Sequence, residues 1–150
     1  MRRPKNATLL DADQWEYAIR SNYGPSKVDY GTHIGFRGAC DVIQAGNLRM
    51  HWISGRLRMV YQSPSETDEI ASDVFMVGGY SGAMRMEFDD RLIELETGGV
   101  MYVSPLAART MHFDGEFAHV SVRLPVDFVS DAIGPFSFQG IEALDNTNFY

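Results

Sequence analysis

The spacing of apolar positions predicts one α-helix near the start of the chain, over residues 11–25. Its apolar residues recur at three- and four-residue steps, which places them on one face of a helix. Asp11 and Gln14 have the spacing of a capping box, and Gly24 followed by Pro25 ends a helix. The face that we expect to pack against the rest of the protein holds Trp15, Ala18, Ile19 and Tyr23.

From about residue 28 to residue 122 the apolar period changes to two, as in β-strands. In residues 48–53, for example, apolar Leu48, Met50 and Trp52 alternate with Arg49, His51 and Ile53. Turn-forming residues interrupt this region regularly and leave about eight or nine short strands. Such a series predicts a mainly β fold, an antiparallel barrel or sandwich.

Three turn signals divide the β region further. Asp89 and Asp90 separate two alternating runs and predict a hairpin, and a second hairpin is expected around Asp114-Gly115. The glycines within residues 78–82 ("GGYSG") predict a bulge or a corner of a barrel. After the last strand, residues 124–135 predict a short helix with four apolar residues on one face: Phe128, Val129, Ala132 and Ile133.

Composition and charge narrow the function. The chain has 150 residues, of which 45% are hydrophobic and 22% charged, as expected for one globular domain. Its net charge of −7 argues against direct DNA binding, because the phosphate backbone attracts clustered Lys and Arg. The single cysteine, Cys40, allows no internal disulfide and favours a cytoplasmic location. No apolar run approaches the roughly 18 residues of a membrane span, and no secretory signal begins the chain.

The chemistry-bearing residues do not form a familiar catalytic or metal motif. No two of the four histidines are two residues apart, the spacing that places a pair of ligands on one side of a strand. His112 and His119 could face each other across the second predicted hairpin and bind a metal, but each is more often a polar group on a strand. Neither a G-x-S-x-G elbow nor a phosphate-binding loop is present. We therefore expect no metal, no cofactor and no enzyme activity.

A barrel of this kind can instead bind a small molecule in its lumen, because ligand pockets are mostly apolar with a few convergent polar groups. Strand alternation puts His119, Ser121 and Arg123 on one face and their apolar neighbours on the other. The sequence leaves open which of the two faces lines the lumen. Our candidates for lumen ligand-binding residues are Trp52, Tyr80, Arg85, Tyr102, His112 and His119.

The order of these segments is similar to that of a known family. A helix with the pattern W…I…YGP precedes "LRMHWIS", then "VFMVGGYSG", then the hairpin "MRMEFDDRLIELETGGVMYVSP", and last "HVSVRLPVDFV". Over roughly residues 10 to 135, this order resembles the N-terminal sensor domain of AraC/XylS-type transcription regulators. In the turn at Leu95–Gly99, Thr97 stands where the family has proline, and Gly99 where it has aspartate.

The resemblance implies a cupin-like antiparallel β-barrel (a double-stranded β-helix) with a short N-terminal and a C-terminal helix. It implies a barrel that binds a small-molecule effector of unknown identity or mediates homodimer formation. DNA would be bound only by a C-terminal helix-turn-helix domain absent from these residues. The expected layout is a mobile arm over residues 1–10, the sensor domain over residues 11–140, and the start of a linker over residues 141–150.

Two other functions stay open at this point. A stand-alone cupin enzyme would be favoured by bound iron, zinc or manganese, and a ligand-storage barrel would lack a partner domain. Two helix-turn-helix patterns in the gene after Tyr150 would distinguish the regulator from the storage barrel. For the regulator, we expect the effector to order the basic N-terminal arm and so to change how two subunits present their DNA-binding halves.

Overall fold

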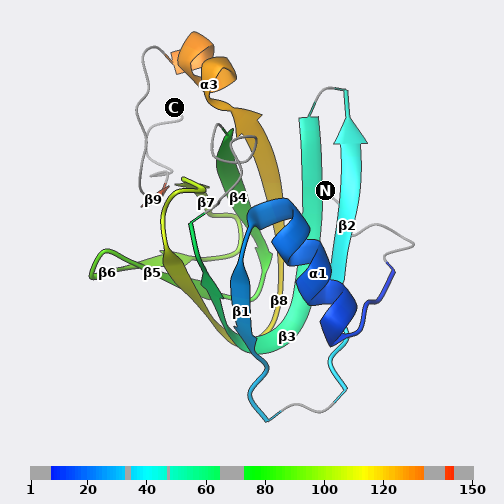
Figure 1. The fold of residues 1–150 in the computed structure, drawn as a ribbon. Coiled ribbons are helices and arrows are strands. Elements are labelled where there is room, and N and C mark those ends of the chain that lie inside the picture. Colours follow the sequence, from blue (N-terminus) through cyan, green and yellow to red (C-terminus); the bar gives the residue numbers. More distant parts are fainter. Residues whose placement is uncertain (1–7, 33–34, 47, 65–72, 134–140, 144–150) are drawn as a thin grey trace.

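Nine strands of the described chain pair antiparallel in one curved sheet, with a helix near each end of the strand series (Figure 1). The structure is a computed structural model that describes residues 8–32, 35–46, 48–64, 73–133 and 141–143. In chain order the elements are α1 (Ala12–Tyr23), β1 (Ser26–Asp29), β2 (Ala39–Ala45), β3 (Leu48–Gln62), β4 (Asp73–Ser81), β5 (Met84–Phe88), β6 (Arg91–Leu95), β7 (Val100–Val103), β8 (Arg109–Pro125), α3 (Val126–Ile133) and β9 (Ile141–Ala143).

Two long strands, β3 and β8, form the spine of the sheet. They pair with each other along nearly their whole length, from Arg49↔Arg123 to Gln62↔Arg109. On its other edge β3 pairs with β2 and then with β1, whereas β8 pairs with β5 and then with β4. The sheet continues from β4 to β7 and β9, and β6 extends β5 as a projecting hairpin (Figure 1). Because each long strand pairs with two short ones in succession, the sheet bends around its own inner face.

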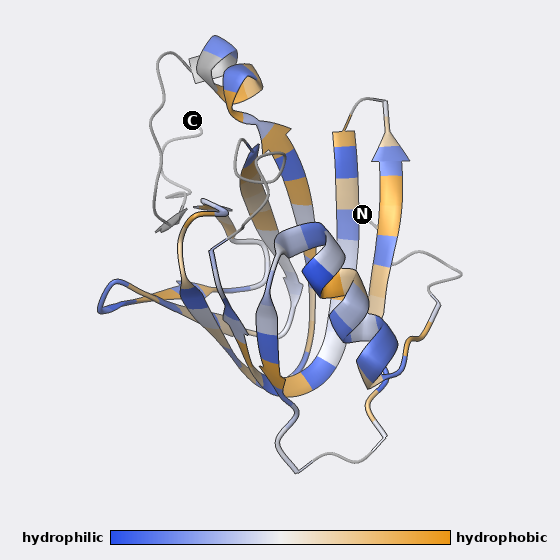
Figure 2. Ribbon diagram, viewed as in Figure 1, coloured by the Kyte–Doolittle hydropathy of each residue, from blue (hydrophilic) through white to orange (hydrophobic). Residues whose placement is uncertain are grey.

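Alternation along the strands gives this sheet two faces, visible as bands along β3 and β8 in Figure 2. The inner face forms the main core, which includes Phe75, Met86 and Met101. Helix α1 packs over the open side of the curve and contributes Trp15, Ile19 and Tyr23 to the same core (Figure 1). The buried Trp15 indole donates a hydrogen bond to the Ala39 carbonyl, 3.2 Å away, and so ties α1 to β2.

Several elements expected from the sequence are confirmed. The capping box of α1 is formed, because the Asp11 carboxylate accepts from the Gln14 amide (2.9 Å) and the Gln14 side chain accepts from the Asp11 amide (3.1 Å). Asp89 and Asp90 both have positive φ, 48° and 59°, as a two-residue hairpin turn between twisted strands requires. The sheet register shifts between Gly79 and Ser81, where the sequence predicts a bulge.

The second predicted hairpin is wrong. Residues 109–125 form the single strand β8, and Gly115, with a φ of 145°, pairs with Leu57 of β3 instead of reversing the chain. A register shift in β3 between Leu57 and Met59 lies at the same level, so both spine strands bend here together. The Asp114-Gly115 signal therefore marks a bend in a strand, because β3 pairs with β8 on both sides of it and with Gly115 itself, whereas the pairing with β5 ends at Phe113.

The ends of the domain also differ in detail from expectation. In α3, Val129 is buried in a small cluster, but Phe128 is 57% exposed and does not share its apolar face. Leu10 forms an isolated β-bridge with Gly38, and Ile141–Ala143 pair with β7, so backbone pairing reaches into the residues expected to be arm and linker. The rest of the predicted arm, residues 1–7, and of the linker, residues 144–150, lies outside the described residues. No helix in the described part of the chain is long and apolar enough to cross a membrane.

Candidate functional site

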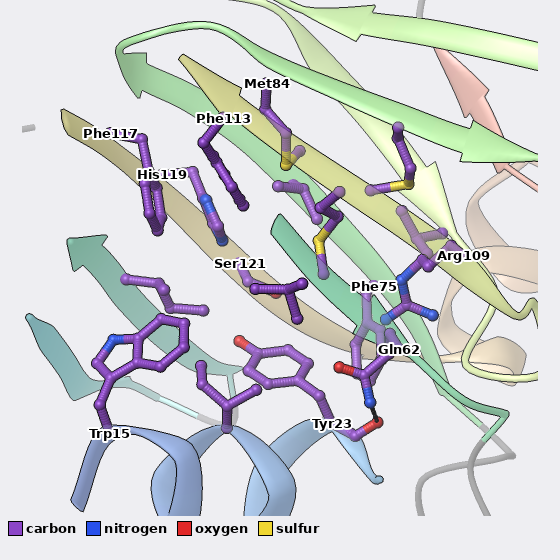
Figure 3. A pocket seen from close by; sticks show the side chains of 17 residues that line it. Trp15, Tyr23, Gln62, Phe75, Met84, Arg109, Phe113, Phe117, His119 and Ser121 are labelled. Carbon is purple, nitrogen blue, oxygen red and sulfur yellow. Dashed lines mark hydrogen bonds between the residues drawn. The ribbon is translucent and has the colours of Figure 1, made fainter. Parts of the chain in front are cut away.

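A cavity lies between the inner face of the sheet and helix α1 (Figure 3). Its volume is about 50 Å³, enough for roughly three water molecules if one water needs about 15 Å³. Its walls come from α1 and from β3, β4, β5, β7 and β8. Most of the lining is apolar, including Phe75, Met84, Met86 and Met111. Five polar side chains also face it: Tyr23, Gln62, Arg109, His119 and Ser121.

Gln62 joins the end of α1 to the sheet beside this cavity. Its Nε2 shares its two N–H groups among the backbone carbonyls of Tyr23 (3.0 Å), Gly24 (2.9 Å) and Pro25 (2.8 Å). These carbonyls lie at the end of the helix and just after it, where no backbone amide of the helix is available to satisfy them. Gln62 therefore fixes the position of Tyr23 at the cavity wall.

Tyr23 and Ser121 bring two buried hydroxyl groups to the middle of the cavity, from α1 and from β8 (Figure 3). Tyr23 is 7% exposed and Ser121 is 1% exposed. The two hydroxyl groups lie near enough for Ser121 to act on the Tyr23 pKa, against the effect of burial, but neither has a partner of good hydrogen-bond geometry among the described residues. The Tyr23 ring is held edge-on against Phe75, with 5.1 Å between ring centroids, and against His51, with 5.4 Å. Burial raises the Tyr23 pKa well above its usual value, so this side chain is a neutral phenol.

Arg109 places a guanidinium at one end of the cavity, near Gln62 and Phe75 (Figure 3). The residue is only 5% exposed. Its Nη1 donates to the backbone carbonyls of Ala107 (3.0 Å) and Ser104 (3.5 Å), in the turn between β7 and β8. Burial lowers its pKa to about 10, which still leaves it protonated at neutral pH. It forms no ion pair with any carboxylate of the described residues.

His119 closes the opposite end of the cavity. Its ring stacks on Phe117 (centroids 5.6 Å apart), which in turn stacks on Phe113 (4.0 Å). Burial lowers the His119 pKa to about 4, so the imidazole is neutral at physiological pH. The cavity thus has one permanent positive charge, at Arg109, and neutral hydrogen-bonding groups along the rest of its polar wall.

Of the six residues predicted to line the lumen, only His119 does so. Trp52 lies on the other face of β3, where its ring meets Tyr80 at 4.7 Å. Tyr102 alternates with Val103, which lines the cavity, and so points away from it. The lumen predictions for Trp52, Tyr80 and Tyr102 are therefore corrected, because the inner face carries the opposite alternation of their strands.

Two further predicted lumen residues contact carboxylates outside the cavity. Arg85 Nη2 lies 2.9 Å from Asp114 Oδ1, and His112 Nε2 lies 3.1 Å from Glu87 Oε1. Their strand neighbours Met84, Met86, Met111 and Phe113 line the cavity instead. Arg85 and His112 therefore belong to the outer face, and the expectation that they reach the lumen is also corrected.

Sequence reasoning missed Tyr23, Gln62 and Arg109 as cavity residues. The two-residue spacing from Arg109 to Met111 and Phe113 places all three on one face of β8, which is the inner face. This spacing is the sequence signal for Arg109. Elsewhere in the described chain, no three His, Cys, Asp or Glu residues gather as metal ligands would. Cys40 is free, and burial raises its thiol pKa to about 11, so it is a weak nucleophile.

Comparison with solved structures shows the fold. The AraC-like transcriptional activator CuxR is similar, with a TM-score of 0.62 and 16% identity over 86% of this chain and 51% of that chain. Ethanolamine utilization protein Q from Salmonella typhimurium has a TM-score of 0.50 and 6% identity, over 80% of this chain and 98% of that one. A cupin-2 domain protein from Shewanella frigidimarina aligns less closely, at 0.45 and 12% identity over 58% and 79%.

The sequence matches no family model and no curated protein. The chain spans about half the length of CuxR, 51%. At these low identities the comparisons establish architecture alone. The domain has a cupin-like antiparallel β-barrel fold, the architecture that the order of its segments implies.

Proposed function

We propose that this chain is the effector-sensing domain of an AraC-type transcription regulator, in which a separate helix-turn-helix domain binds DNA. The observation that carries the proposal is the cavity, with hydroxyl groups of Tyr23 and Ser121 buried at its wall and lacking described partners. Buried polar groups are nearly always hydrogen-bonded in native proteins, so a ligand that bonds to them would relieve a real cost. The fold shared with an AraC-like activator supports the regulatory assignment.

The position of the cavity supports a route from ligand to response. One wall is helix α1 and the other walls are strands, so a molecule inside would touch both Tyr23 and Ser121. A ligand shifts a conformational equilibrium only through different affinities for the two states. We expect the effector to favour the state in which α1 lies against the sheet, and this state in turn to change how two subunits associate.

The proposed role is recognition and not catalysis. Among the described lining residues, the one imidazole, His119, stacks on Phe117, and none is a carboxylate that could orient it as the third member of a catalytic triad. The polar groups come from α1, β3 and β8 and are spread from one end of the cavity to the other, instead of converging on one reacting atom. This arrangement supports binding of a small molecule without turnover.

The test is a screen of the full-length protein that contains this chain. A panel of sugars, aromatic acids and small amines is added, and both the melting temperature and operator binding are measured. We expect at least one class to raise the melting temperature, because a ligand that binds only the folded state stabilises it. The same class should change the affinity for operator DNA or the dimerisation constant.

A pair of variants assigns the response to the cavity. Ser121→Leu fills the cavity with a larger apolar side chain and should abolish the effect of the ligand. Val120→Leu makes a similar change on the opposite face of the same strand and should preserve it. If Ser121→Leu still responds like the parent protein, or no compound changes operator binding or dimerisation, the proposal is wrong.

A further inference from the structure

The most unusual group in the cavity is the buried cation of Arg109. A buried ion is normally accompanied by an opposite charge, since the loss of hydration costs several kcal/mol in total even after relaxation. Among the described residues, the other buried arginine of β8, Arg123, follows this rule and pairs with Asp73. Arg109 is more deeply buried but contacts only neutral backbone carbonyls.

The local structure accounts for one nitrogen of the Arg109 guanidinium. Nη1 donates to Ala107 and Ser104 and so holds the turn between β7 and β8. A guanidinium has five N–H donors, however, and Nη1 supplies only two of them. No described residue accepts a hydrogen bond from Nε or Nη2. This edge of the guanidinium has the fork geometry that binds a carboxylate with two parallel hydrogen bonds.

The other polar groups of the cavity do not neutralise Arg109. Tyr23 lies close enough to influence it, but burial keeps the phenol protonated. His119 is neutral at physiological pH, and the Gln62 amide is uncharged and donates to backbone carbonyls. The cavity therefore keeps a net positive charge, which an anionic ligand would balance.

The shape of the cavity limits the size of that anion. A volume of about 50 Å³ is well below the roughly 150 Å³ of an engineered cavity that binds benzene. Flexible methionines line one wall, at Met84, Met86 and Met111, and an unbranched thioether side chain repacks easily around a ligand. These features suit a compact acid with a short apolar tail better than a sugar or a nucleotide.

We propose that the effector is a compact monocarboxylic acid whose carboxylate binds the free edge of Arg109. The hydroxyl groups of Tyr23 and Ser121 donate further hydrogen bonds to polar atoms of the ligand, and the apolar tail lies against Met84 and Met86. This inference rests on the proposed effector-sensing function and specifies the chemical class that the cavity recognises.

The experiment measures binding of acetate, butyrate, hexanoate and benzoate to the full-length protein by calorimetry and thermal shift. The matched primary amides serve as neutral ligands of nearly the same shape. We expect at least one acid to bind about tenfold or more tightly than its amide, since bonds between charged groups are stronger than neutral ones. Equal binding of acid and amide, or no binding of any acid, would overturn the inference.

Variants assign the preference to one residue. Arg109→Gln should reduce acid binding about tenfold or more, whereas Arg85→Gln, which removes an outer-face arginine, should leave it unchanged. If Arg109→Gln does not fold, Arg109→Lys keeps the charge without the fork and should weaken binding, and Ser121→Ala should weaken it less. Full acid affinity in either Arg109 variant would contradict the assignment.

The outcomes separate this inference from the proposed function. If a sugar or an amine binds and changes operator affinity while acids do not, the sensing function stands and the carboxylate assignment fails. If acids bind through Arg109 but neither operator affinity nor dimerisation changes, the carboxylate site stands and the regulatory function fails.

Discussion

The two ends of strand β8 each bury an arginine, but in different surroundings. At the C-terminal end, Arg123 donates from Nε and Nη2 to one oxygen of Asp73, at 2.9 and 2.6 Å, and so connects β8 to β4. At the N-terminal end, Arg109 meets backbone carbonyls and the cavity. Arg123 therefore has a counter-ion within the fold, whereas the positive charge of Arg109 has none among the described residues. Arg123 thus has a structural role, whereas Arg109 is available to bind an anion.

The largest expected effect comes from breaking the completed pair. Asp73→Ala leaves Arg123 largely buried without its anion, and we expect the free energy of unfolding to fall by about 3 kcal/mol. Urea unfolding at pH 7 measures this change. Removing both partners, in Asp73→Ala with Arg123→Met, should recover much of the loss. If Asp73→Ala costs less than about 1 kcal/mol, the contrast between the two ends does not hold.

Acid should also destabilise the fold, by protonating histidines that are neutral in it. The pKa of His51 is lowered to about 4, by burial first and then by Arg49 and Arg123; its Nε2 meets the Asn22 side-chain oxygen at 3.1 Å and its ring packs on Tyr23. Between about pH 6.5 and 4 the unfolded chain binds a proton at this residue and the folded chain does not. Stability is therefore present above pH 6.5 and lost as the pH falls to about 4.

The same sign applies to His119, whose pKa burial also lowers to about 4. We expect a loss on the order of 2 kcal/mol for each histidine at pH 4, relative to pH 7. Urea unfolding at a series of pH values measures the slope. His51→Gln should reduce the slope between pH 6.5 and 4, and an unchanged slope would show that His51 is not the titrating group.

Replacing the unpaired arginine should have a smaller effect and can have the opposite sign. Arg109→Gln removes a buried charge without a described counter-ion while keeping a donor for the Ser104–Ala107 turn. We expect the ligand-free protein to change by no more than about 1 kcal/mol, or to become more stable. The same urea measurement tests this, and a loss near that of Asp73→Ala would assign Arg109 a purely structural role.

The smallest effect is expected at the surface pair between Arg85 and Asp114. These side chains are 41% and 69% exposed, so water and salt screen their attraction. Asp114→Asn should cost about 0.5 kcal/mol or less, with the difference shrinking as salt is added. A larger loss of unfolding free energy would mean that side-chain exposure does not predict how much an ion pair stabilises this fold.

The sequence predicted well the features that depend on local chemistry. The capping box of α1, the hairpin at Asp89-Asp90 and the irregularity near Gly79 each follow from a few adjacent residues, because they are set by backbone geometry and short hydrogen bonds. The mainly β fold followed from the period of two, which is a repeated local signal.

Features that depend on distant partners could not be predicted in the same way. Asp114-Gly115 has the composition of a turn, but the pairing of Gly115 with Leu57 of β3 keeps the chain in the sheet. Period two divides a strand into two faces without saying which one is inside, so five of the six proposed lumen residues were placed on the wrong side. Parity within β8 places Arg109 on the same face as Met111 and Phe113, but it does not show that this face lines a cavity covered by α1.

The contribution of α1 to the cavity wall has a kinetic consequence. Because the helix that covers the interior also supplies Tyr23 to it, occupancy and helix docking are thermodynamically linked. A bound molecule should therefore slow amide hydrogen exchange throughout residues 12–23, far more than in the outlying β5–β6 hairpin. The time that a ligand stays bound would then be set by the rate at which α1 detaches from the sheet.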